Sequence, residues 1–219
     1  MTVRGGELLE SADLVVYAGS LVNPRLLEYS TGKKIDSQHM KLSDITGIMA
    51  QYAEAGKTVV RLHSGDPSLY GAIYEQMEEL KKRGIGCEII PGVSSLFGCA
   101  ASLRTQLTLK GVSDTLIITR PAGETLEKDA LKELSAHGAT MAVFLGAHRI
   151  REILAEVEYP EDTPAAVVYH ATWEDEVLLR GTVADIADKA EAHKIEKSAL
   201  LIIGEVLNPR SFERSHLYG

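Results

Sequence analysis

The chain has 219 residues, 45% of them hydrophobic and 25% charged, and its formal net charge is −8. These values are typical of a globular protein with a buried core, and the acidic balance argues against a general nucleic-acid binder. No apolar run reaches the roughly 20 residues of a membrane span, and no signal-peptide core follows Met1. We therefore expect a cytoplasmic protein with no nucleic-acid or membrane partner.

Cysteine and histidine are spaced in a way that predicts no metal site. Cys87 and Cys99 lie in apolar surroundings, so we expect small buried hydrophobic residues and not a disulfide or redox pair. His63, His148 and His170 have no partner histidine three or four residues away. We therefore expect no protein-bound metal.

In the first half of the chain, short apolar runs rich in branched residues alternate with amphipathic stretches. This alternation predicts a mostly parallel sheet covered by helices on both faces. The predicted helices cover residues 6–12, 25–29, 42–55, 72–83 and 96–103. The predicted strands cover residues 14–17, 34–35, 58–62, 87–90 and 115–119.

A turn-rich break at residues 120–124 is the best candidate for a linker. We therefore expect an N-terminal α/β domain over residues 1–120 and a C-terminal α/β domain over residues 121–219. Helices are predicted in the second half at residues 130–137, 150–157 and 183–193, and strands at 140–145, 165–170, 176–182 and 199–203. The strands at 165–170 and 176–182 are close enough to pair antiparallel, which predicts a mixed second sheet.

The sharpest local feature is the string HSGDPSLY at residues 63–70, directly after a predicted strand. Ligands of open α/β sheets bind at the carboxyl ends of strands. Gly65 lets a ligand approach the backbone, and the Asp66 carboxylate can accept hydrogen bonds from hydroxyls or a cationic amine. An Asp-Pro pair that caps the next helix without any ligand is an equally good interpretation.

A second loop, PGVSS at residues 91–95, also follows a predicted strand and opens a helix. Backbone amides at a helix start, together with the hydroxyls of Ser94 and Ser95, can bind a carboxylate or ring acceptors. A simple serine cap is the alternative. Neither loop has the GxGxxG spacing of a dinucleotide fold or a Walker lysine, which disfavours NAD and ATP.

Two strand ends in the second half carry small residues, in the strings FLGAH at 144–148 and YHATW at 169–173. Small residues there could admit a flat adenine between the domains, although tight turns also require them. No Ser/His/Asp or Cys/His order predicts a hydrolase.

Five strings, SGDPSLYG, IIPGVSS, FLG, HAT and ALLIIGEV, follow the order of the tetrapyrrole methylase family across roughly the whole chain. The chain therefore resembles this family. Within it, YAGSLVNP at residues 17–24, ATWEDE at 171–176 and LRGT at 179–182 resemble members that methylate C11 of precorrin-4 or cobalt-precorrin-4.

The resemblance implies two α/β domains with S-adenosylmethionine (SAM) in a cleft between them, usually in a homodimer. It implies a SAM-dependent C-methyltransferase of corrin-ring biosynthesis with a tetrapyrrole substrate and S-adenosylhomocysteine as product. Motif by motif, it assigns SAM contacts, with Asp66 as the anchor, to Ser64, Gly65, Asp66, Leu69, Ser94, Ser95, Leu145 and Ala171. No catalytic base is indicated. By position only, Arg104, Lys110 and Arg120 could meet the substrate's carboxylates, the alternative being solvated surface charge.

Family members begin with a strand and a Gly-Pro-Gly-Asp-Pro loop ahead of residues 2–5 of this chain, which starts at Met1. The chain is therefore expected to lack a strand inside the first sheet and a loop that faces the tetrapyrrole. Two alternatives follow. One is another tetrapyrrole methylase, acting on a different ring carbon or on uroporphyrinogen. The other is a non-catalytic module that binds SAM or a tetrapyrrole.

Overall fold

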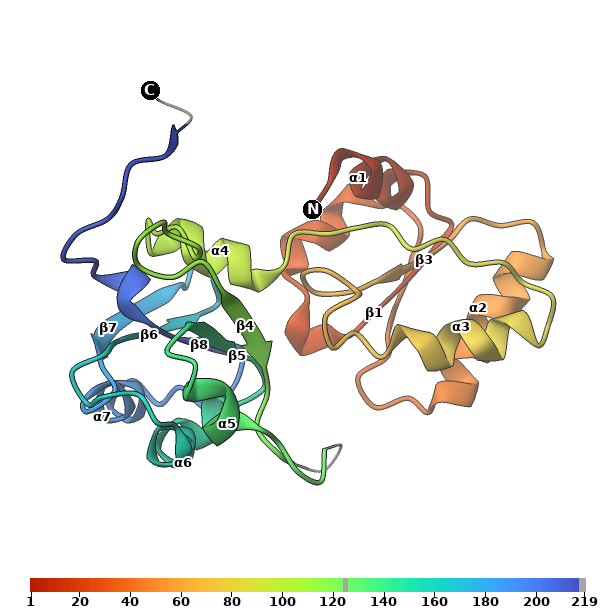
Figure 1. Ribbon diagram of the computed structural model, residues 1–219. Coiled ribbons are helices and arrows are strands. Elements are labelled where there is room, and N and C mark those ends of the chain that lie inside the picture. Colours follow the sequence, from red (N-terminus) through yellow and green to blue (C-terminus); the bar gives the residue numbers. More distant parts are fainter. Residues whose placement is uncertain (124–125, 217–219) are drawn as a thin grey trace. The chain divides into compact units, whose positions relative to one another are not determined.

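The protein is described by a computed structural model that covers residues 1–123 and 126–216 (Figure 1). The chain divides into two compact units, Met1–Ser95 and Leu96–Gly219, called here the first and second units. Each contains a sheet flanked by helices. Within the described ranges, no helix is both long and apolar enough to cross a membrane.

The first unit is built on a three-stranded parallel sheet. Strand β1 (Leu14–Tyr17) lies between β2 (Lys33–Asp36) and β3 (Val59–Leu62), and both pairings are parallel. The carboxyl ends of all three strands therefore lie at one edge, where Tyr17 is in register with Asp36 and with Leu62. The prediction of a mostly parallel first sheet is confirmed.

Helices cover both faces of this sheet. The elements are α1 (Val3–Glu10), α2 (Leu42–Glu54), α3 (Ile73–Lys81) and the 3-10 helices η1 (Gly19–Leu21) and η2 (Pro24–Tyr29). Leu14 and Val16 pack against α2 and α3, whereas Val15, between them in β1, packs against Leu9 of α1. Successive strand residues point to opposite faces, so a continuous apolar run such as LVVY is buried on both sides.

The strand predicted at residues 87–90 is wrong, because this segment is not a strand. The first sheet ends at β2 and β3, and branched residues become a strand only where a neighbour can take up their backbone hydrogen bonds. Cys87 is also exposed, contrary to expectation, whereas Cys99 is buried as predicted. Burial, with a smaller contribution from the Glu176 charge, raises the pKa of Cys99 to about 12.

The second unit contains a five-stranded sheet in the order β4-β5-β8-β6-β7. Its strands are β4 (Leu116–Thr119), β5 (Thr140–Val143), β6 (Pro164–Tyr169), β7 (Val177–Thr182) and β8 (Ala199–Ile203). Strands β4 and β5 are parallel and the other pairings are antiparallel, which confirms the mixed sheet and the predicted β6–β7 pairing. The helices are α4 (Ser95–Ser102), α5 (Leu131–Ser135), α6 (Ile150–Glu156), α7 (Ile186–Ala192), η3 (Ala147–Arg149) and η4 (Glu205–Leu207).

Both faces of the second sheet are buried. Ala166 and Val168 of β6 pack on the side of α4, whereas Ala165 and Val167 pack on the side of α6 and α7. Figure 1 shows α4 on one side of the sheet and α6 and α7 on the other. The central strands β5, β6 and β8 are therefore largely apolar, which is why the sequence predicts them well.

The domain boundary predicted after residue 120 stays a prediction. In the structure, residues 96–120 group with the second unit, because β4 pairs with β5 and because Leu96 and Leu103 lie in its core. Glu124, the last residue of the predicted linker, lies outside the described residues.

Candidate functional site

In the first unit, Asp66 links the loop after β3 to the segment before α4. Its Oδ2 accepts a hydrogen bond from the Gly92 N–H at 2.9 Å. Its Oδ1 accepts from the Ser68 N–H at 2.9 Å and from the Ser68 hydroxyl. The Ser68 hydroxyl first, and then the two backbone N–H groups, hold the pKa of Asp66 below its usual value. The carboxylate therefore stays charged near neutral pH and ties the two loops together.

The same two loops touch through their glycines. A Cβ on Gly92 would lie 2.0 Å from the Gly65 carbonyl oxygen, which leaves no room for a side chain. A Cβ on Gly65, which has a φ of +67°, would lie 3.4 Å from the Ser94 Cα and from the Ser95 nitrogen. The structure thus brings together the predicted residues Gly65, Asp66, Ser94 and Ser95.

The loop after β3 ends in strained backbone. Tyr70 and Ala72 adopt left-handed conformations, with φ values of 55° and 47°. Left-handed non-glycine residues raise the energy of the folded chain and cluster at binding sites. Leu69, the other predicted contact here, is half-buried and donates its N–H to the Asp66 carbonyl at 3.2 Å, while Ser64 is exposed.

In the second unit, Leu145 stands two residues beyond the end of β5. It has a φ of 56°, and 58% of its surface is exposed. An exposed leucine contributes little hydrophobic stabilisation to the folded chain, and its left-handed backbone conformation is unfavourable. Both features agree with the predicted role of Leu145 as a ligand contact.

The turn between β6 and β7 carries Ala171 between two left-handed residues, His170 with φ 47° and Thr172 with φ 72°. Hydrogen bonds hold the turn, from His170 N–H to the Ser198 carbonyl at 3.1 Å and from Trp173 N–H to the His170 carbonyl at 2.9 Å. The His170 ring stacks on Trp173 with centroids 4.2 Å apart, and its Nδ1 lies 2.9 Å from Asp175.

Sheet register places Leu145 and Ala171 at one edge of the second sheet. Strand β8 pairs antiparallel with both β5 and β6, so β5 and β6 run in the same direction. Met141 and Ala165 are both paired with Ile203, so both strands end toward the same edge of the sheet, where β6 extends two residues further than β5. Each unit therefore gathers its own predicted contacts at or beside a strand end, whereas the predicted cleft stays a prediction.

Three basic residues, Arg104, Lys110 and Arg120, are candidates for binding the substrate's carboxylates. Lys110 Nζ lies 3.2 Å from the Glu213 carboxylate. Arg104 has a left-handed φ of 51° just after α4. A role for either residue, or for Arg120, in binding the substrate stays a prediction.

Sequence reasoning missed Arg61, which points from β3 toward β1. Its Nη1 donates to the Val16 carbonyl at 3.1 Å and its Nε to the Gln76 side chain at 3.0 Å. Burial lowers the pKa of Arg61. The preceding and following residues are apolar strand formers, so nothing in the local pattern distinguishes this arginine from a surface one.

Two residues further along, half-buried His63 leads to a pH prediction. Burial first, and then the Arg61 charge, lowers the pKa of His63 from 6.5 to about 4. Between these values the unfolded chain binds a proton that the folded chain does not, so stability falls as the pH falls. The slope from this residue is at most about 1.4 kcal/mol per pH unit. Urea unfolding from pH 7 to 4 should show a smaller slope in His63→Gln than in the wild type.

The matched control is His39→Gln, because His39 is exposed and belongs to the same unit. It should keep the slope of the wild type. Equal slopes in all three proteins would show that His63 takes up its proton as readily in the folded chain as in the unfolded one.

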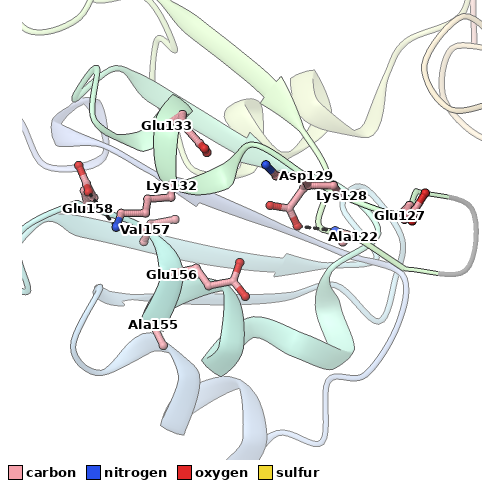
Figure 2. Close-up of a pocket in the computed structure, with 10 residues that line it drawn as sticks. All are labelled: Ala122, Glu127, Lys128, Asp129, Lys132, Glu133, Ala155, Glu156, Val157 and Glu158. Carbon is pink, nitrogen blue, oxygen red and sulfur yellow. Dashed lines mark hydrogen bonds and ion pairs between the residues drawn. The ribbon is translucent and has the colours of Figure 1, made fainter.

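A cavity of about 670 Å³ lies elsewhere in the second unit (Figure 2). Its lining consists of Ala122, Glu127, Lys128, Asp129, Lys132, Glu133, Ala155, Glu156, Val157 and Glu158. Five carboxylates against two lysines make it acidic, which disfavours a carboxylate-rich substrate, and no predicted site residue lines it. Among residues 1–123 and 126–216, no group of three His, Cys, Asp or Glu could hold a metal ion.

Both units of this α/β protein carry strained loops with small residues at the carboxyl ends of strands, and these loops are the candidate ligand-binding elements. The family of Tetrapyrrole (Corrin/Porphyrin) Methylases matches residues 1–187, and the chain belongs to this family. The family resemblance predicted from the sequence is confirmed.

Individual relatives cover nearly the same length. The chain is 52% identical over 225 residues to a cobalt-precorrin-4 C(11)-methyltransferase of Methanocaldococcus jannaschii, covering 100% of this chain and 87% of that protein. It is 42% identical over 223 residues to a precorrin-4 C(11)-methyltransferase of Pseudomonas aeruginosa, with 100% and 89% covered.

Solved structures of methyltransferases that act on tetrapyrroles are similar to this chain as well. A cobalt precorrin-4 methyltransferase is 40% identical with a TM-score of 0.91, covering 95% of this chain and 90% of that one. A uroporphyrin-III C-methyltransferase from Thermus thermophilus, complexed with S-adenosylhomocysteine, is 26% identical with a TM-score of 0.79, covering 94% and 92%.

Proposed function

We propose that the chain is a SAM-dependent methyltransferase that methylates C11 of precorrin-4 or cobalt-precorrin-4. The observation that carries the proposal is the 52% identity, over the whole chain, to a relative named for this reaction. Relatives at 42% and 40% identity carry the same reaction in their names, with or without cobalt. A uroporphyrinogen-III C-methyltransferase is 30% identical, which favours C11 over that substrate.

The residues at the strand ends fit SAM. Ala171 is half-buried, and its backbone N–H and carbonyl have no hydrogen-bond partner among the described residues. A small side chain beside a spare donor and acceptor suits the edge of a flat adenine. Exposed Leu145 offers an apolar surface at the same sheet edge. We propose SAM contacts for these two residues and for Ser64, Gly65, Asp66, Leu69, Ser94 and Ser95.

The proposed reaction demands positioning more than acid–base chemistry. When bound, SAM would supply an electrophilic methyl group: its bond to sulfur breaks as the bond to the ring carbon forms, S-adenosylhomocysteine leaves, and the ring system loses one proton. The chain's residues hold the carbon and the methyl group in line and exclude water, and such positioning can lower a barrier by about 7–11 kcal/mol. We name no catalytic base and no protein-bound metal.

A titration followed by product analysis tests the proposal. The purified chain is titrated with SAM and then incubated with cobalt-precorrin-4 or precorrin-4, and the products are weighed by mass spectrometry. We expect binding, and a product heavier by one methyl group in place of one hydrogen. A gain of mass on uroporphyrinogen alone would reject C11 methylation. Binding without any gain would favour the non-catalytic module.

We also propose that the protein is cytoplasmic, and that it forms a homodimer, as the family resemblance implies. Light scattering of the purified chain should give twice the mass of one chain. A monomer that still methylates would reject the dimer and leave the proposed reaction intact.

A further inference from the structure

Glu176, just before β7, connects the Ala171 turn to α4. Its Oε2 accepts a hydrogen bond from the Thr172 N–H at 2.6 Å and another from the Ser102 hydroxyl at 2.7 Å. Ser102 is the last residue of α4, and Thr172 directly follows Ala171. One carboxylate oxygen of half-buried Glu176 therefore bridges two elements that lie far apart in the sequence.

The turn needs such a support because its backbone is strained. His170 and Thr172 are both left-handed, and a β-branched threonine is among the residues that least favour this conformation. Each left-handed residue raises the energy of the turn. The conformation persists only where neighbouring groups determine it. At Thr172, the Glu176 carboxylate accepts the hydrogen bond from the backbone N–H and so helps to fix this conformation.

The turn also packs closely on α4. A Cβ on Gly98 would lie 3.2 Å from the Thr172 Cγ2 and 3.6 Å from the Ala171 Cβ. The small residue at position 98 admits the turn, and the bridge from Glu176 to Ser102 holds it there. Ala171 is thus fixed from both sides, while its own N–H and carbonyl find no partner among the described residues.

We propose that Glu176 is a positioning residue for SAM: by holding Thr172 and Ser102, it keeps the Ala171 backbone in the conformation that meets the adenosyl group. The inference rests on the proposed function, and it adds a residue that touches neither SAM nor the ring. Its carboxylate acts through the turn, since both of its hydrogen bonds go to protein groups.

Binding of S-adenosylhomocysteine, without any turnover, tests the inference. The ligand is titrated calorimetrically and by fluorescence of Trp173, which is the only tryptophan and lies two residues from Ala171. Glu176→Ala should raise the Kd about tenfold or more, as expected for loss of hydrogen bonds to a charged acceptor. Glu176→Gln keeps an acceptor oxygen and should restore most of the affinity. With SAM, KM should rise in Glu176→Ala while kcat at saturation changes little.

Controls separate this effect from a general loss of fold. Glu196→Ala removes an exposed carboxylate of the same unit and should leave the Kd unchanged. Thr172→Gly relieves the left-handed strain, so the effect of Glu176→Ala should shrink in that background. If Glu176→Ala does not fold, Ser102→Ala takes its place, with a Kd raised about threefold as expected for one hydrogen bond.

The outcomes are distinguishable. If the wild type does not bind S-adenosylhomocysteine, the proposed function itself fails. If the wild type binds and Glu176→Ala binds equally well, the positioning role is overturned while the proposed function stands. The same holds if Thr172→Gly leaves the effect of Glu176→Ala undiminished, because the carboxylate would then not act through Thr172.

Discussion

Gly92→Ala should destabilise the first unit and weaken SAM binding together. The new Cβ would lie 2.0 Å from the Gly65 carbonyl oxygen and 3.3 Å from the Asp66 Cα, and both are backbone atoms that cannot swing aside. The two loops must separate, which also stretches the hydrogen bond from the Gly92 N–H to Asp66. We expect a loss of about 1–3 kcal/mol of unfolding free energy, as for other overpacked sites.

The matched control is Gly86→Ala, in the same segment between α3 and α4. A Cβ at Gly86 would meet nothing within 4 Å, so this substitution should be neutral or slightly stabilising. Chemical unfolding and calorimetric titration with SAM measure both effects in the two variants. Wild-type stability and affinity in Gly92→Ala would show that the loops tolerate separation and that their contact does not shape the site.

The strands show which parts of a fold can be read from a sequence. Residues 199–203 are predicted as a strand and form β8 with the same bounds, because the apolar run is bounded by polar turns and is buried on both faces. Residues 87–90 also end in two isoleucines but form no strand. Residue types indicate the propensity of a segment to form a strand. A strand also needs an adjacent strand to pair with, and the local sequence does not show whether one is present.

The candidate site also combines features that the sequence predicts with features that it does not. Loops at strand ends are local features, so Gly65, Leu145 and Ala171 could be proposed from short strings. The contacts that shape these loops are not local. Glu176 and Ser102 are 74 residues apart. No residue type predicts such a bridge, because a glutamate beside a turn is usually a solvated surface residue.

Backbone strain was equally hidden from the sequence. Glycine, asparagine and aspartate are the residues from which a left-handed conformation can be predicted, because they adopt it most readily. Leu145, Thr172 and Tyr70 adopt it nonetheless. Sequence rules fail here because the conformation is imposed by the surrounding structure, and such failures are expected at functional sites.

Asp66→Ala should lower SAM affinity and first-unit stability in parallel. The carboxylate accepts hydrogen bonds from the Gly92 N–H and from the N–H and hydroxyl of Ser68. Its removal leaves the part-buried Gly92 N–H without its acceptor, for which we expect a loss of about 1–2 kcal/mol and a Kd raised about tenfold. Asp66→Asn should fall between, because one amide oxygen can still accept from Gly92 while the amide NH₂ meets the Ser68 donors.

Calorimetric titration with SAM and urea unfolding of the same samples measure the two effects, with Glu54→Ala as the control for loss of an exposed carboxylate in the same unit. A large loss of affinity at unchanged stability would show that Asp66 acts only through its own contact with SAM, and that its link between the two loops adds nothing to stability. The dependence of stability on pH in acid gives a second test. Because the folded pKa of Asp66 lies below its usual 3.8, its contribution is complete above that value and is lost as the pH falls through the folded pKa. The stability difference between wild type and Asp66→Ala should therefore be constant from pH 8 to about 5 and shrink only in stronger acid.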